Sequence, residues 1–323
     1  MFFQNVYKGR NEFWAYLLTI LVVGLAYTLG GIPFMTKAFF AAREQGLDRI
    51  ETMEAIQQMD FTRLGMDPNI AMLFLLLVFV ITFVALWWMV RLLHQRSFKS
   101  LITTNNRLNW SKMGFGFLLW MCFSLVVEGT GYLLEPENYS FSFNASSFIP
   151  LLVIAFLLLP IQTSAEELFF RGYLMQALGQ VSGERLFPLF TTSILFGLMH
   201  MANPEVSKFG TAIMMTYYIG MGLFLGLLTV MDESLELALG IHAANNIFGV
   251  AFVNFDGSAL QTDALFHTSE VHMELMLSFF VVFTTIITFI CAKKYGWKDW
   301  GKLRRPIERQ ALEQATTPVD TNE

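Results

Sequence analysis

Residues 70–90 read IAMLFLLLVFVITFVALWWMV and contain no charged side chain. A helix crosses about 30 Å of hydrocarbon with roughly 20 mostly apolar residues, because each residue adds about 1.5 Å to its length. This stretch therefore predicts a membrane-spanning helix, and it places the chain among integral membrane proteins.

Outward from this stretch, the same pattern returns along most of the chain. Of the 323 residues, 54% are hydrophobic and only 15% are charged, a balance that ordinary soluble domains do not show. We expect an all-α, polytopic membrane bundle of about eight transmembrane helices, formed by residues 1–305 as a single domain. The seven further apolar runs lie near residues 14–34, 114–134, 148–178, 186–202, 211–231, 235–255 and 273–292.

The charges between these runs predict the orientation of the chain. Lysine and arginine gather in the short cytoplasmic loops of membrane proteins. The segments 135–147 and 254–270 contain acids and no Lys or Arg, so we expect them outside the cell. Both termini are expected in the cytoplasm, and the protein in the cytoplasmic (inner) membrane of a bacterium. The loop after residues 70–90 is basic and has no acid; it carries Arg91, Arg96, Lys99, Arg107 and Lys112.

Two segments lie outside the expected spans. Segment 37–69 is expected outside the cell, although it carries four basic residues among six acids. Leu47, Ile50, Met53 and the Ile56/Gln57 turn recur in it at helical spacing, which predicts an amphipathic connector that lies on the outer membrane surface or caps the bundle. A substrate lid is the alternative. The tail 306–323 is polar, and we expect it to be disordered in the cytoplasm.

Ionisable side chains are concentrated in the region 148–255, the expected catalytic motif region. Inside hydrocarbon such groups cost several kcal/mol, so each one is a functional hypothesis by default. Glu167 and Arg171 are four residues apart, which predicts an ion pair on one helix face. Glu166 points about 100° away from Glu167, and we expect it to lack a partner on its own helix. Glu128, also without an obvious partner, is expected to approach the outer headgroups.

These polar residues suggest a hydrolytic site. A partly desolvated Glu166 carboxyl suits a general base that activates water, and His200 from another span suits the orientation or deprotonation of that water. His242 and Asn246 lie four residues apart on one helix face, where two donors can form an oxyanion hole for a carbonyl oxygen. Asn245 stands beside Asn246 and leaves open which of the two amides enters the cavity.

Three motifs follow one another along the chain: Glu166-Glu167-x-x-x-Arg171, Phe196-x-x-x-His200 and His242-x-x-x-Asn246. From about Leu158 to Gly249 the chain resembles the CAAX prenyl endopeptidase and bacteriocin-processing family of intramembrane proteases, the group related to the Ras-converting enzyme. The resemblance implies a membrane fold of about eight helices and a mechanism without metal or cofactor. It implies that Glu166 and His200 activate water and that His242 with Asn246 stabilises the oxyanion. Supporting roles would fall to Glu167, Arg171 and Phe196.

The implied substrate is a membrane-embedded or lipid-modified peptide or protein, with prenylated CAAX tails as the eukaryotic targets. A zinc protease with Glu166, His200 and His242 as ligands is one alternative, although the His-Glu-x-x-His pair of typical zinc proteases is absent from the sequence. Another is a non-catalytic membrane protein, such as an immunity factor, a scaffold or a proton-relaying transporter. A lone histidine or an Asn pair in a membrane often only bridges helices. The sequence carries no nucleic-acid-binding signature.

Overall fold

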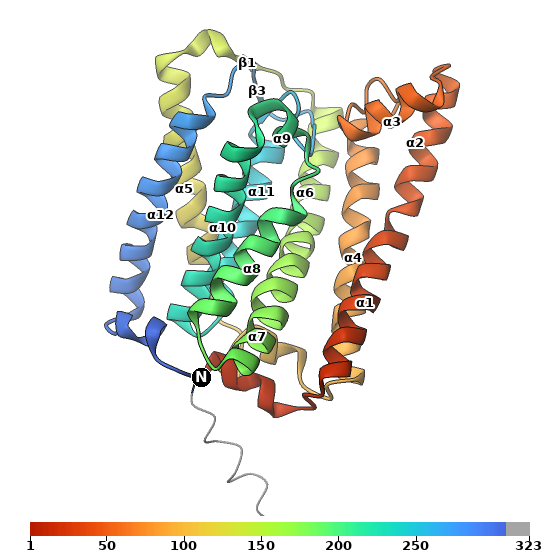
Figure 1. Cartoon of the computed structure of the whole chain (residues 1–323). Helices are drawn as coiled ribbons and strands as arrows, with labels where there is room; N and C mark the ends of the chain where they lie inside the picture. Colours follow the sequence, from red (N-terminus) through yellow and green to blue (C-terminus); the bar gives the residue numbers. More distant parts are fainter. Residues whose placement is uncertain (308–323) are drawn as a thin grey trace, which may run out of the picture.

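The computed structural model describes residues 1–307, and most of this chain is helical (Figure 1). The prediction of an all-α membrane protein is confirmed. The α-helices are α1 (Phe13–Gly30), α2 (Ile32–Glu44), α3 (Arg49–Gln57), α4 (Pro68–Leu92), α5 (Trp110–Leu134), α6 (Ala145–Glu167), α7 (Met175–Ser182), α8 (Leu186–Met199), α9 (Pro204–Phe209), α10 (Thr211–Asp232), α11 (Glu236–Ala251) and α12 (Met273–Tyr295). The other elements are the 3-10 helices η1 (Phe2–Lys8), η2 (Phe98–Leu101), η3 (Pro136–Asn138) and η5 (Trp300–Arg304), the π-helical η4 (Leu168–Leu174), and the strands β1 (Tyr139–Phe141), β2 (Val253–Phe255) and β3 (Phe266–Thr268).

Among the described residues, six helical stretches are long and apolar enough to cross a membrane. The helices α8 and α11, in contrast, have 14 and 16 residues. At about 1.5 Å per residue they reach about 21 and 24 Å, less than the thickness of the hydrocarbon. The expected count of eight spans is therefore not confirmed. The six stretches are Phe13–Glu44, Pro68–Leu92, Trp110–Leu134, Ala145–Ser182, Thr211–Asp232 and Met273–Tyr295.

The short helix α11 lies in the interior of the bundle, where α5, α6 and α10 pack against it. Its residues Leu237 and Ile241 are fully buried in an apolar cluster formed with α5, α10 and α12. Gly240 approaches α5 so closely that a Cβ atom there would collide with the backbone oxygen of Met113. The helix is therefore apolar because protein surrounds it, and it carries His242 into the interior of the molecule.

The helices α1 to α4 form one side of the bundle, at the right of Figure 1. The short helix α3 begins at Asp48, whose carboxylate accepts hydrogen bonds from two backbone N–H groups at 2.7 and 2.8 Å. The segment 37–69 thus contains a helix at the expected place. Ala55 and Ile56 are buried against α2 and α4, whereas Ile50 is 71% exposed.

A three-stranded sheet closes one end of the bundle, which we call the sheet end, and its strand order is β1-β3-β2. Strand β1 runs antiparallel to β3, and β2 runs parallel to it. At the start of β1, the hydroxyl of Tyr139 donates a hydrogen bond to the carboxylate of Glu128 in α5 at 3.0 Å. The expectation that Glu128 has no partner is therefore wrong, because this strand folds back over the end of α5.

Both ends of the described chain pack at the opposite end of the bundle, which we call the terminal end (Figure 1). Phe2 and Phe3 of η1 are buried there in the apolar core. Ile307, expected in the tail, belongs to the same core, and its N–H donates to the backbone oxygen of Gly183 at 2.7 Å. The rest of the expected disordered tail, residues 308–323, lies outside the described residues.

Candidate active site

The acidic motif lies at an irregular turn of the longest helical stretch. The elements α6, η4 and α7 follow one another without a break from Ala145 to Ser182. Glu166 and Glu167 are the last two residues of α6, directly before the π-helical segment η4. Single π-helical turns are rare in proteins and are frequent at functional sites. The helix thus changes its geometry at the point where it presents its two acids.

Glu167 and Arg171 form the predicted ion pair, with 2.8 Å between Oε1 and Nη1 and both side chains fully buried. Arg171 also donates to the backbone oxygen of Gly222 in α10 at 3.4 Å. Its guanidinium lies over the ring of Phe196 in α8, 4.2 Å from the ring centroid. Because the pair has lost its hydration, each charge depends on the other for its stability.

The Glu167 carboxylate also holds His242 of α11. His242 Nδ1 lies 2.8 Å from Glu167 Oε1, the same oxygen that accepts from Arg171. Because a carboxylate only accepts, Nδ1 carries the proton in this contact. His242 Nε2 lies 3.6 Å from Oε2 of Glu166. The imidazole therefore stands between the two acids of the motif.

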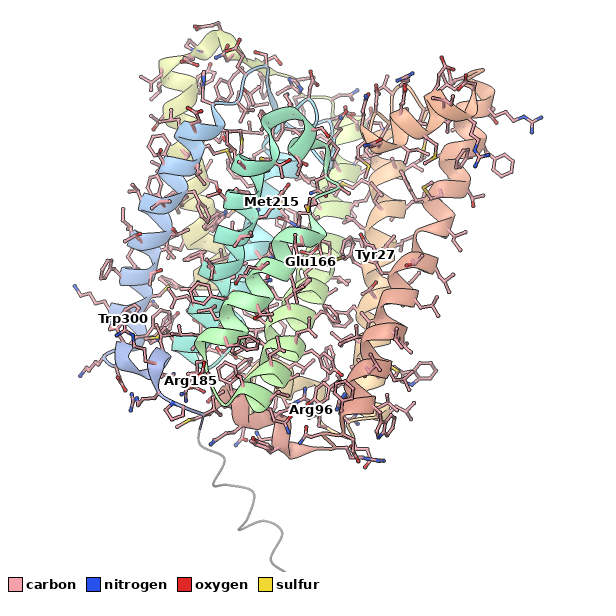
Figure 2. The ribbon with its side chains drawn as sticks, in the orientation of Figure 1. Tyr27, Arg96, Glu166, Arg185, Met215 and Trp300 are labelled. Atoms are coloured by element: carbon pink, nitrogen blue, oxygen red, sulfur yellow. The ribbon has the colours of Figure 1, made fainter. Side chains whose placement is uncertain are left out.

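Glu166 has one engaged oxygen and one free oxygen. Gln162, four residues earlier on α6, donates from Nε2 to Oε1 of Glu166 at 2.7 Å. The expectation that Glu166 lacks a partner on its own helix is therefore wrong. The other oxygen, Oε2, is buried and receives no hydrogen bond from any described residue. Figure 2 places Glu166 near the middle of the bundle, on the flank that faces Tyr27 of α1.

His200 directly follows α8, and its ring lies beside that of Phe196. Its Nδ1 lies 2.8 Å from the backbone oxygen of Phe196, so Nδ1 carries the proton and Nε2 of the neutral ring keeps its lone pair. The ring of Phe196 lies 4.6 Å from the His200 ring and 5.9 Å from the His242 ring. The structure thus brings both histidines to the ring of Phe196, and His242 in turn lies beside Glu166.

The two neighbouring asparagines of α11 have different partners. Asn246 donates from Nδ2 to Oε1 of Gln162 at 2.8 Å, and Gln162 in turn holds Glu166. Asn245 donates to Oδ1 of Asn246 at 3.0 Å, and its own oxygen accepts from the hydroxyl of Tyr217 at 3.5 Å. Of the two amides, Asn246 is therefore the one linked more directly to Glu166.

Two contacts of the site were missed by reasoning from the sequence. Gln162 precedes Glu166 by four residues, the helical spacing that predicted the Glu167–Arg171 pair, but a neutral amide gives no charge signal that would mark it as a partner of the acid. Tyr218 of α10 stacks on the His200 ring with 4.5 Å between centroids and 27° between planes. Nothing in the sequence indicates this second contact, because it depends on how α10 packs against α8.

The arrangement gives no support to the zinc alternative. In the part of the chain that the structure describes, no group of three or more His, Cys, Asp or Glu side chains is placed to hold a metal ion.

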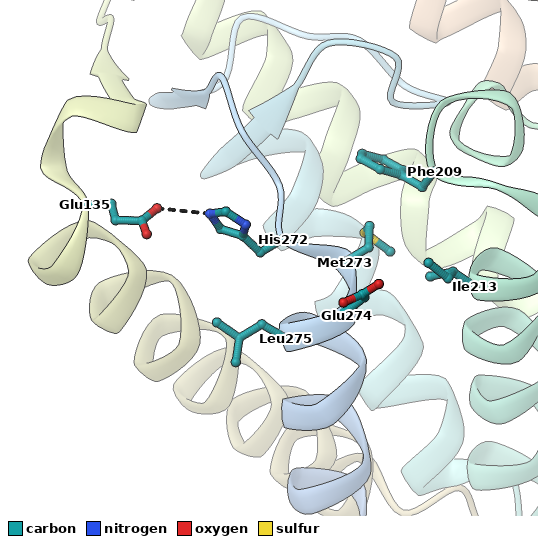
Figure 3. A pocket seen from close by; sticks show the side chains of 7 residues that line it. All are labelled: Glu135, Phe209, Ile213, His272, Met273, Glu274 and Leu275. Atoms are coloured by element: carbon teal, nitrogen blue, oxygen red, sulfur yellow. Dashed lines mark hydrogen bonds and ion pairs between the residues drawn. The ribbon is translucent and has the colours of Figure 1, made fainter.

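A surface pocket lies elsewhere, at the sheet end (Figure 3). In it, His272 Nε2 lies 3.1 Å from Oε2 of Glu135. The pocket contains none of the predicted site residues, so it is separate from the polar cluster around Glu166. Its lining consists of Glu135, Phe209, Ile213, His272, Met273, Glu274 and Leu275.

Comparison with known proteins finds a family whose model matches the segment that carries the cluster. The family model of type II CAAX prenyl endopeptidase Rce1-like proteins matches residues 145–248, from the start of α6 to the last turn of α11. The uncharacterized protein YyaK of Bacillus subtilis (strain 168) is 34% identical over 247 residues, which are 76% of this chain and 80% of that protein. No solved structure matches the chain.

Proposed function

The chain belongs to the type II CAAX prenyl endopeptidase Rce1-like family, and from this membership and the polar cluster we propose that it is an intramembrane endopeptidase. Its proposed substrate is a membrane-embedded or lipid-modified peptide. The observation that carries the proposal is the state of the Glu166 carboxylate: Oε1 is held by Gln162, while the buried Oε2 is unpaired and lies 3.6 Å from Nε2 of His242. A carboxylate oxygen of this kind is ready to take a proton from water.

In the proposed reaction, Glu166 and His200 activate one water molecule. Nε2 of neutral His200 is an acceptor, so it can orient the water while Oε2 of Glu166 removes a proton from it. The water oxygen bonds to the carbonyl carbon of the scissile peptide. When the tetrahedral intermediate collapses, the C–N bond breaks and Glu166 returns the proton to the leaving amine.

The negative oxygen of the intermediate needs donors, and His242 and Asn246 are the proposed ones. The Glu167 carboxylate holds the imidazole of His242 through Nδ1, and Nε2, when it carries a proton, is the group that donates to the oxyanion. Asn246 uses one amide hydrogen on Gln162 and keeps the second for the same task. Each such donor contributes roughly 3 to 4 kcal/mol in hydrolases where it has been removed.

The test is cleavage of an internally quenched, farnesylated peptide with a Cys-aliphatic-aliphatic-X end by the purified full chain in lipid nanodiscs. The variants Glu166→Gln and His200→Ala are expected to lower kcat/KM by about 100- to 10,000-fold, the range that general base catalysis contributes. The matched control is Glu128→Gln, which changes a span glutamate bonded to Tyr139 and is expected to cleave at the wild-type rate.

Two results would reject this function. One is a Glu166→Gln variant that folds and cleaves like the wild type. The other is a loss of activity in 1,10-phenanthroline that stoichiometric zinc restores, which would replace the glutamate mechanism by a zinc mechanism. A rate that survives the chelator, together with an inactive Glu166→Gln variant, is the expected outcome.

A further inference from the structure

A directed row of hydrogen bonds leads from α11 to Glu166. Asn245 donates to the side-chain oxygen of Asn246 at 3.0 Å. Asn246 donates to Oε1 of Gln162 at 2.8 Å, and Gln162 donates to Oε1 of Glu166 at 2.7 Å. The hydroxyl of Tyr217 is the first donor of the row, 3.5 Å from Asn245. Every amide accepts from the residue behind it and donates towards the Glu166 carboxylate.

The direction of this row fixes the orientation of the Gln162 amide. Its oxygen faces the Asn246 donor, so its NH₂ group faces Glu166. Rotation of the amide by 180° would place oxygen against the carboxylate and NH₂ against NH₂, and both hydrogen bonds would be lost. Gln162 is only 7% exposed, and an unpaired buried polar group costs about 1 to 3 kcal/mol. One orientation of the amide is therefore strongly favoured.

We propose that Gln162 is a positioning residue for Glu166: its amide, oriented by Asn246, holds Oε1 and leaves Oε2 turned towards Nε2 of His242 and the attacking water. This inference rests on the proposed function and adds a residue that lies outside all three sequence motifs. It also gives Asn246 a second task besides the oxyanion, since Asn246 sets the direction of the bond that reaches the base.

The kinetic test compares Gln162→Met with the wild type on the farnesylated quenched peptide. Methionine keeps the length and approximate volume of the side chain and removes the amide. We expect kcat to fall about 10- to 100-fold while KM stays unchanged, because a base that is misplaced by a fraction of an ångström still meets bound substrate but reacts more slowly. Gln162→Asn keeps an amide that is one methylene shorter, and its kcat is expected to be reduced as well.

Gln176→Met is the matched control. Gln176 is also a fully buried glutamine, and it bonds to the backbone oxygen of Ser100 and to Arg96 at the terminal end, away from the cluster. A role in packing alone would lower the thermal stability of both methionine variants and leave kcat of both unchanged. The proposal requires that only Gln162→Met lowers kcat.

A second measurement needs no turnover. The carboxyl stretch of protonated Glu166 is identified in infrared difference spectra by its loss in Glu166→Gln. Because a donor on the carboxyl oxygen weakens the C=O bond, this band is expected at higher wavenumber in Gln162→Met and at its wild-type position in Gln176→Met.

The outcomes separate the two proposals. An infrared band that does not move, or a wild-type kcat in Gln162→Met beside an inactive Glu166→Gln, overturns the role of Gln162 alone. A Glu166→Gln variant with full activity overturns the proposed function.

Discussion

Glu167 is the residue on which most of the site geometry depends. Its Oε1 accepts from Arg171 and from Nδ1 of His242, each at 2.8 Å. Its charge therefore balances a buried guanidinium and fixes the orientation of a proposed oxyanion donor at the same time. This carboxylate therefore affects both the stability of the fold and the proposed catalysis, and two substitutions can separate the two effects.

Glu167→Gln is expected to lower the free energy of unfolding by about 3 to 5 kcal/mol, because it leaves Arg171 buried without a counter-charge. Adding Arg171→Met removes that charge, so the double variant is expected to regain most of the stability. It should remain slow on the farnesylated peptide, since His242 still lacks its carboxylate. Thermal unfolding and kcat of both variants test this, and a double variant with wild-type kcat would contradict the role of Glu167 in orienting His242.

Glu205 gives the stability of the fold a pH dependence through a buried carboxylate. It lies in α9, outside the spanning helices, is 8% exposed, and accepts from the backbone N–H of Ala259 at 2.7 Å. Burial raises the pKa of Glu205 above its ordinary value of 4.5. Between these two pKa values the folded chain binds the proton more tightly than the unfolded chain, so the free energy of unfolding falls as pH rises.

Glu205→Gln is therefore expected to flatten the fall of stability as pH rises above 4.5. The melting temperature is measured across this range for the wild type, for this variant and for Glu270→Gln, an exposed control on the loop before α12. The control is expected to show the same change of melting temperature with pH as the wild type. If Glu205→Gln showed that same change too, the burial of Glu205 would not be the cause of the pH dependence.

At the level of residues, local spacing predicted what lies on one helix and little else. The Glu167–Arg171 pair followed from a separation of four residues between opposite charges. The Gln162–Glu166 bond has the same separation, yet only the structure shows that Asn246 orients the amide towards the acid. The stacking of Tyr218 on His200 depends on the packing of α10 against α8, which hydropathy and spacing do not specify.

At the level of elements, hydropathy predicted every long apolar helix. It did not distinguish a helix surrounded by lipid from a helix surrounded by protein. The run near 235–255 reads as a span, yet α11 is 16 residues long and is buried by α5, α6 and α10. A buried helix and a lipid-facing helix have the same apolar composition. The close contact of Gly240 with α5 is the structural sign of the buried case, and it leads to a prediction about stability.

Gly240→Ala is expected to destabilise the fold by about 1 to 3 kcal/mol, because the new methyl group collides with the backbone of Met113 and pushes α11 away from α5. Peptidase activity should fall as well, since His242 lies about half a helical turn after Gly240 on α11 and moves with it. Gly249→Ala on the same helix is the control: nothing lies within 4 Å of its added Cβ, so it should be neutral or stabilising. Equal melting temperatures for the two variants would show that the α5–α11 contact is loose.

At the level of the whole molecule, charge and architecture divide the bundle into two unlike ends. Arg96 and Arg185 lie at the terminal end together with η1 and the last described residues (Figure 2). The sheet end carries the acidic segments 135–147 and 254–270. The rule that basic loops stay in the cytoplasm therefore predicts one orientation for the entire bundle, with the terminal end inside.

This orientation predicts which cysteines an impermeant maleimide reaches in intact bacterial cells. The two native cysteines, Cys122 and Cys291, are free thiols and are first replaced by alanine. In that background, Ser142→Cys at the sheet end is expected to react in intact cells, and Asn106→Cys in the basic loop only after permeabilisation; both positions are exposed. Labelling of Asn106→Cys in intact cells would show that the bundle has the opposite orientation in the membrane. It would also mean that α6, which carries Glu166, enters the membrane from the cytoplasm and not from outside.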